Sequence, residues 1–218
     1  MADVFQFRSS ASLVMLTGRK AHNLEELLGL IETCSGSSIF FHTFSAFFKM
    51  RDAHVPFNTD FAMWTATMLN EKALAEKLMA IDLWEQATVE SLRRRLLKLI
   101  KNYRKENPGA FEKTAEEPLY LHDMARVVYL TDRFAYNLKT FRDVLLTVSI
   151  NSIYFHFVES RLESGLQTND FSAWIEHSLE MPELADRVSR IDLSVFTPEG
   201  LRERIVELID DYLKEIGR

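Results

Sequence analysis

An internal duplication constrains the fold of this chain more than any other feature of its sequence. Five blocks recur in the same order in the two halves, and the partners lie 114, then 110 and finally 109 residues apart. The matched blocks are LTGRKAHNL (16–24) and LTDRFAYNL (130–138), SIFFH (38–42) and SIYFH (152–156), TDFAMW (59–64) and NDFSAW (169–174), LAEKLMAIDL (74–83) and LADRVSRIDL (184–193), and TVESLRRRLLKLI (88–100) and TPEGLRERIVELI (197–209). Apolar periodicity alone would not reproduce LT-x-R-x-A-x-N-L, so we interpret the chain as two copies of one unit.

The duplication sets the expected domain organisation. Repeat A covers 1–107, repeat B covers 118–218, and 108–117 reads as the linker between them. Short helices bury their apolar faces poorly alone, so we expect the repeats to form one compact domain about a pseudo-twofold axis.

The chain has only 7 Gly and 5 Pro in 218 residues, which favours helices over β-turns. The predicted fold is therefore all-α: an internally duplicated helical bundle with about six helices in each repeat. VFQF (4–7) and PLYL (118–121) alternate as short strands do, but no sheet is predicted from them. The helices expected in repeat A span 10–20, 24–34, 37–51, 59–69, 71–81 and 88–106. The same helices are expected at the equivalent positions of repeat B.

The net charge and the cysteine content disfavour several classes of function and indicate where the protein is located. The formal net charge of −6 disfavours general binding to nucleic acid or to an anionic membrane surface. Cys34 is the only cysteine, so no intrachain disulfide can form, and we predict a cytoplasmic location without membrane attachment. The charge is uneven, because residues 1–109 hold 14 basic and 12 acidic side chains and the remainder holds 12 and 20.

The aromatic segments 38–42 and 152–156 each contain one histidine, His42 and His156. A histidine in such surroundings serves as a structural hydrogen-bonding group, as part of a ligand pocket, or as a metal or haem ligand. No HExxH or CxxC pattern accompanies either copy, so no metal and no cofactor are predicted. The structural interpretation, with a hydroxyl or a backbone carbonyl as partner, is the simplest of the three.

Other polar and aromatic residues recur in both repeats and complete the set of candidate ligand-binding residues. Each has a plainer structural interpretation: the arginines near helix C-termini, the asparagines as N-caps, the tryptophans in the core. Asp82 and Asp192 are expected to form salt bridges with Arg93 and Arg202. The candidates are Arg19, Asn23, Ser38, His42, Trp64, Arg133, Asn137, Ser152, His156 and Trp174.

The motifs LTGRKAHNL, SGSSIFFH, DFAMW and LAEKLMAID together resemble an uncharacterised family of bacterial and archaeal proteins, a domain of unknown function. The resemblance spans essentially the whole chain and implies no catalytic or binding residue. The second copy departs from the first motif, where Asp132 and Phe134 replace Gly18 and Lys20.

The sequence predicts a non-enzymatic binding or regulatory protein, with a groove or cavity between the repeats and a protein or small molecule as partner. Gly-rich phosphate loops and nucleophile elbows are missing from the sequence, and no catalytic residue is assigned. The alternative is a small enzyme acting on an anionic metabolite, with His42 as acid or base and Arg19 binding the anion. Neither the oligomeric state nor the partner follows from the sequence.

Overall fold

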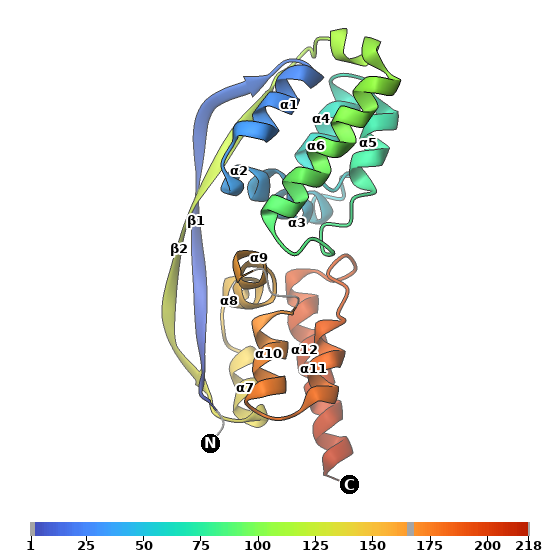
Figure 1. Cartoon of the computed structure of the whole chain (residues 1–218). Coiled ribbons are helices and arrows are strands. Elements are labelled where there is room, and N and C mark those ends of the chain that lie inside the picture. The colour runs from blue at the N-terminus through green and yellow to red at the C-terminus, as the bar shows by residue number, and fades with distance from the viewer. Residues whose placement is uncertain (1–2, 165–167, 218) are drawn as a thin grey trace. The chain divides into compact units, whose positions relative to one another are not determined.

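The computed structural model describes residues 3–164 and 168–217 and shows a mixed α/β chain. Helices make up 58% of the chain and strands 16%, and the strands form an antiparallel two-stranded sheet (Figure 1). The prediction of an all-α helical bundle is therefore wrong. The sheet consists of β1 (Phe5–Ala21) and β2 (Leu119–Ala135), each 17 residues long.

The error lies in one segment and its copy, because the helix expected over 10–20 is the second part of β1. Phe5, Phe7 and Ser9 are buried while Arg8 is exposed, which is the alternation expected of a strand. SASLVMLTGRK has no such alternation, and its Leu, Met and Ala residues are good helix formers. Pairing with a strand more than a hundred residues away overrides that local preference.

The remaining helices of repeat A form where the sequence predicts them. The segment expected as one helix over 37–51 is continuous but contains a π-helical turn, η1. The elements are α1 (Leu24–Thr33), α2 (Gly36–Phe40), η1 (Phe41–Ser45), α3 (Ala46–Asp52), α4 (Asp60–Thr67), α5 (Lys72–Met79) and α6 (Val89–Glu106). A short 3₁₀ helix, η2 (Pro108–Glu112), occupies half of the segment predicted as a linker.

Repeat B follows the same order, and its π-helical turn, η3, falls at the equivalent place. Its elements are α7 (Leu138–Leu145), α8 (Ile150–Tyr154), η3 (Phe155–Glu159), α9 (Ser160–Ser164), α10 (Asp170–His177), α11 (Pro182–Ser189) and α12 (Pro198–Ile216). Among the described residues, no helix combines the length and the apolar character needed to cross a lipid bilayer.

Local capping explains where several of these helices begin. The side chain of Thr88 accepts a hydrogen bond from the Ser91 backbone N–H at the start of α6. Thr197 caps α12 in the same way, and Pro198 occupies the first helical position. Such caps satisfy backbone N–H groups that have no partner inside the helix.

The chain forms two compact units, and these are not simply the two repeats. Unit 1 comprises Met1–Ala11 and Arg126–Arg218, and unit 2 comprises Ser12–Ala125. The first part of each strand therefore belongs to the unit built from the helices of the other repeat. The packing of the two repeats into one body stays a prediction.

Each exchanged strand segment contributes two large side chains to the core of the unit that it enters. In unit 1, Phe5 packs against Phe141 and Trp174 with ring centroids 5.5 and 5.4 Å apart, and Phe7 is fully buried. In unit 2, the equivalent positions Leu119 and Leu121 are also buried. Burying a side chain of this size contributes about 1.5–3 kcal/mol, so both exchanged segments are firmly anchored.

Candidate functional site

The site common to both units surrounds a buried histidine at the π-helical turn of a long helical segment. His42 lies in η1 and His156 in η3, and they are 1% and 2% exposed. A π-helical turn inserts one residue into a helix and often marks a functional or structurally special position. Its presence at both histidines shows that the duplication kept the local backbone as well as the side chain.

An aspartate at the start of the next long helix holds one nitrogen of each ring. His42 Nδ1 lies 2.7 Å from Asp60 Oδ2, and His156 Nδ1 lies 2.8 Å from Asp170 Oδ2. Asp60 and Asp170 are the first residues of α4 and α10, where the positive end of the helix dipole favours a carboxylate. Each carboxylate therefore orients a ring and also stabilises a helix.

The other ring nitrogen accepts a hydrogen bond from the exchanged strand. The backbone N–H of His122 donates to His42 Nε2 at 2.9 Å, and that of Arg8 donates to His156 Nε2 at 2.8 Å. A backbone N–H can only donate, so Nε2 carries no proton and Nδ1–H donates to the aspartate. Each histidine is thus a neutral bridge between a helix and a strand.

The electrostatic surroundings of His156 agree with a neutral ring. Burial lowers the pKa of His156, and the hydrogen bond and charge of Asp170 only partly oppose this effect. The partners of both rings are a carboxylate and a backbone N–H, not the hydroxyl or carbonyl expected from the sequence. Among the described residues, no group of three or more His, Cys, Asp or Glu side chains is arranged to hold a metal ion.

The tryptophans that recur in both repeats bind the chain two residues before each of these strands begins. Trp64 Nε1 donates to the Glu117 carbonyl at 2.9 Å, and Trp174 Nε1 donates to the Asp3 carbonyl at 2.7 Å. We call each set of three side chains a strand clasp. The clasp of unit 2 is His42, Asp60 and Trp64, and the clasp of unit 1 is His156, Asp170 and Trp174.

The candidate serines are buried beside the clasps. Ser152 Oγ donates to the Arg8 carbonyl at 2.6 Å, so it binds the residue whose N–H meets His156. Ser38 is 1% exposed, and its hydroxyl lies 3.1 Å from that of Ser35. The structure therefore brings six of the ten candidates, the histidines, tryptophans and serines, to the places where exchanged strands dock.

The other four candidates lie elsewhere, and none shares a hydrogen-bond partner with a clasp histidine. Asn23 and Asn137 are N-caps of α1 and α7, as predicted. The helices expected to end near the two arginines are strands in the structure, because Arg19 lies in β1 and Arg133 in β2. Arg19 nevertheless donates to the Thr33 hydroxyl, at 2.5 Å, at the end of α1.

Two threonines belong to the strand contacts but were missed from the sequence. Thr17 Oγ1 donates to the Leu121 carbonyl at 2.6 Å, and Thr131 Oγ1 donates to the Phe7 carbonyl at 2.7 Å. The repeated pair LT, at 16–17 and 130–131, was the available signal. Its meaning depends on a strand partner that the local sequence does not reveal.

The predicted salt bridges of Asp82 and Asp192 are also wrong. Asp82 Oδ1 accepts hydrogen bonds from backbone N–H groups just after it, at Trp84 and Glu85. Arg93 instead donates to the Ile31 carbonyl near the end of α1, at 2.6 Å.

In repeat B, Asp192 accepts from the Ser194 N–H, and Arg202 donates to the Leu145 carbonyl at the end of α7. A cation at a helix C-terminus is favourable, which explains why both arginines are kept.

Unit 1 contains a buried ion pair beside its clasp. Arg126 Nη1 lies 3.0 Å from Glu159 Oε2, and Glu159 is 3% exposed. Burial raises the pKa of Glu159, against the opposing charge of Arg126. Burial also raises the pKa of Tyr154, and the charge of Glu159 adds to this increase.

The equivalent positions in unit 2 hold no charge. Ser12 replaces Arg126, Ser45 replaces Glu159, and Phe40 replaces Tyr154. The clasp itself is thus common to both units, while the ion pair belongs to unit 1 alone.

Comparisons with known proteins match most of the chain to one family of unknown function. A model described as "Family of unknown function (DUF5752)" matches residues 2–210. The structure of OrfY from Thermoproteus tenax is similar, with 31% sequence identity and a TM-score of 0.82 over 96% of this chain and 95% of that chain. No curated protein sequence matches the chain.

Proposed function

Because this chain belongs to the DUF5752 family, whose function is unknown, we propose its function from its own geometry: a non-enzymatic binding module that docks a partner protein on β1 and β2. One observation carries the proposal. Leu13, Val14, Met15 and Leu16 are four consecutive apolar residues of β1 that are all exposed, and Leu16 is 83% exposed.

The same exposed stretch occurs in both copies of the duplication. The equivalent residues of β2 are 127–130, VVYL, and Val127 and Leu130 are 66% and 61% exposed. Neighbouring residues of a strand point to opposite faces, so exposure of all four leaves both faces of the strand open. Exposed apolar clusters and open strand edges are typical of interaction sites, and soluble proteins otherwise avoid them.

We propose that the partner supplies an extended apolar segment to each strand, which pairs with the edge of that strand and covers its exposed apolar side chains. Backbone hydrogen bonds would give affinity, and the apolar side chains would give selectivity. The net charge of −6 favours a partner segment flanked by basic residues.

The alternative function, an enzyme acting on an anionic metabolite, has less support. A general base needs a free ring nitrogen near its substrate, but both nitrogens of His42 are engaged. Arg19, the proposed anion-binding residue, is directed to Thr33 at the end of α1.

Affinity capture with the purified full-length chain tests the proposal. We expect the native chain to retain specific proteins from an extract of its source organism, and the double variant Leu16→Lys/Leu130→Lys to lose them. Light scattering across a concentration series first establishes whether the chain self-associates.

The matched control is Leu97→Lys, on the half-buried side of α6 and outside both strands. Capture that is equal in native chain and strand variant would overturn the proposal, and so would self-association that the strand variant abolishes. Circular dichroism confirms that each variant is folded.

A further inference from the structure

A groove in unit 2 has a surplus of positive charge that the proposed strand interaction does not use. It lies along α5 and α6, has a volume of about 220 Å³, and is lined by Lys77, Arg95, Lys98, Asn102, Tyr103 and Glu106, among others. Three cations face one carboxylate there, although the whole chain carries a net charge of −6. Such a local reversal of sign attracts small anions.

Two of the three cations have no acidic partner. Lys77 Nζ pairs with Glu106 Oε2 at 3.1 Å and lies over the Tyr103 ring, 5.4 Å from its centroid. Neither Arg95 nor Lys98 forms an ion pair with any residue in the part of the chain that the structure describes. The two are one helical turn apart on α6, so their charged groups can meet on one ligand.

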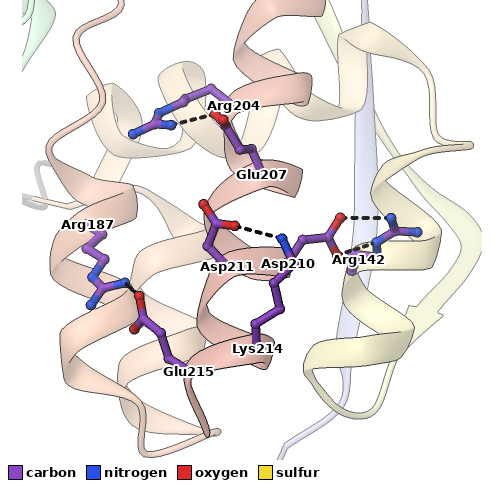
Figure 2. Close-up of polar contacts among 8 residues, drawn as sticks. All are labelled: Arg142, Arg187, Arg204, Glu207, Asp210, Asp211, Lys214 and Glu215. Atoms are coloured by element: carbon purple, nitrogen blue, oxygen red, sulfur yellow. Dashed lines mark hydrogen bonds and ion pairs between the residues drawn. The ribbon is translucent and has the colours of Figure 1, made fainter. Parts of the chain in front are cut away.

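Unit 1 has a partly equivalent groove, and its three cations, Arg187, Arg190 and Arg204, all have acidic partners; that of Arg190 is Asp186. It lies along α11 and α12 with a volume of about 460 Å³, and Arg187 and Arg204 occupy the positions of Lys77 and Arg95. Arg187 pairs with Glu215 at 3.0 Å, just as Lys77 pairs with Glu106 (Figure 2). Arg204 pairs with Glu207 at 2.5 Å, and Glu207 is the residue that replaces Lys98 (Figure 2).

We propose that the groove of unit 2 binds a small molecule through a phosphate-type anionic group held by Arg95 and Lys98. The planar guanidinium of Arg95 can donate two parallel hydrogen bonds, and the Lys98 ammonium supplies a point charge. Leu99 and the Tyr103 ring supply apolar surface for the rest of the ligand. The volume is below the roughly 300–1,000 Å³ of pockets for drug-sized ligands, which suits a small ligand.

Calorimetric titration of the full-length chain with inorganic phosphate and pyrophosphate, at low ionic strength, tests the site. We expect saturable binding to one site, tighter for pyrophosphate. Lys98→Glu gives unit 2 the arrangement of unit 1 and should weaken binding at least tenfold without unfolding, because Glu207 is already accepted there. The reverse change, Glu207→Lys, should release Arg204 and add a second site.

Arg94→Gln is the matched control, since Arg94 is exposed on α6 but does not line the groove. We expect its affinity for pyrophosphate to stay within twofold of the native value. The site is overturned if phosphate and pyrophosphate show no saturable binding. It is also overturned if Arg94→Gln and Arg95→Gln weaken binding equally, because the whole basic face of α6 would then attract any polyanion.

Discussion

The two units hold their exchanged strands in the same way but differ in the charges around that contact. In each, a neutral histidine links an aspartate to a backbone N–H, and a tryptophan binds a carbonyl two residues before the exchanged strand begins. Beside this clasp, unit 1 has the buried pair Arg126 and Glu159, where unit 2 has two serines. Side chains that satisfy buried backbone groups are therefore kept, while neighbouring charges have diverged.

Removing the cation of the buried pair should give the largest difference between the units. Arg126→Met leaves Glu159 buried without its partner, so we expect a loss of about 3 kcal/mol in the free energy of unfolding at pH 7. Ser12→Ala, at the equivalent position of unit 2, should change it by less than about 0.5 kcal/mol. Urea denaturation measures both values.

The double variant Arg126→Ser/Glu159→Ser supplies the control for that comparison. It gives unit 1 the uncharged residues of unit 2 and should recover part of the lost stability. Equal effects of Arg126→Met and Ser12→Ala would contradict a structural role for the ion pair.

Removing either clasp histidine should have the next largest effect, of similar size in the two units. His42→Ala and His156→Ala each leave a strand N–H without its acceptor and open a cavity. We expect each to lower the free energy of unfolding by about 2–3 kcal/mol, measured in urea.

His122→Ala tests whether the backbone or the side chain of the strand matters. It keeps the N–H that donates to His42, so the loss should be below about 1 kcal/mol. A loss as large as that of His42→Ala would show that the His122 ring, and not the clasp, holds the strand.

The pH dependence of stability should reveal the buried ring of unit 1. The pKa of His156 is lower in the folded chain than in the unfolded chain, where it is about 6.5. Below that pH the unfolded chain therefore binds more protons at His156 than the folded chain does, which favours unfolding. Its contribution to stability is present above that pH and is lost as the pH falls. The raised pKa of Glu159 acts in the opposite direction, favouring the folded state at low pH.

His156→Gln separates these two effects. Urea midpoints measured from pH 7.5 to 5 should fall less steeply with decreasing pH in this variant than in the native chain. Parallel curves would mean that His156 does not titrate on unfolding as this geometry requires.

The helices could be predicted from the sequence because their signals are local. Asn23 and Asn137 mark helix starts by capping backbone N–H groups within three residues. The sheet could not be predicted, since β1 and β2 are stabilised by each other and by burial of their first residues. Phe5 and Phe7 of β1 are buried in the core of unit 1, and Leu119 and Leu121 of β2 are buried in the core of unit 2. Only a long-range pairing distinguishes SASLVML from a helix.

The sequence predicted the histidines and tryptophans of the polar site, but neither the clasp aspartates Asp60 and Asp170 nor the contacts that these side chains make. The duplication singles out both histidines and both tryptophans, because random divergence would have replaced them. Their partners lie far along the chain: the N–H that meets His42 is 80 residues away and the one that meets His156 is 148 residues away. The strand exchange that brings these groups together leaves no mark in the local sequence.

Replacing the clasp aspartates by their amides should have the smallest effect, and it tests the charge of the rings. Asp60→Asn and Asp170→Asn keep an oxygen that accepts from Nδ1–H and lose the carboxylate at a helix N-terminus, an effect of about 0.3–1 kcal/mol. We therefore expect each to lower the free energy of unfolding by about 1 kcal/mol or less at pH 7.5, measured in urea. A loss above about 2 kcal/mol in either unit would mean that the carboxylate balances a positive ring, and that ring could not accept the strand N–H at Nε2.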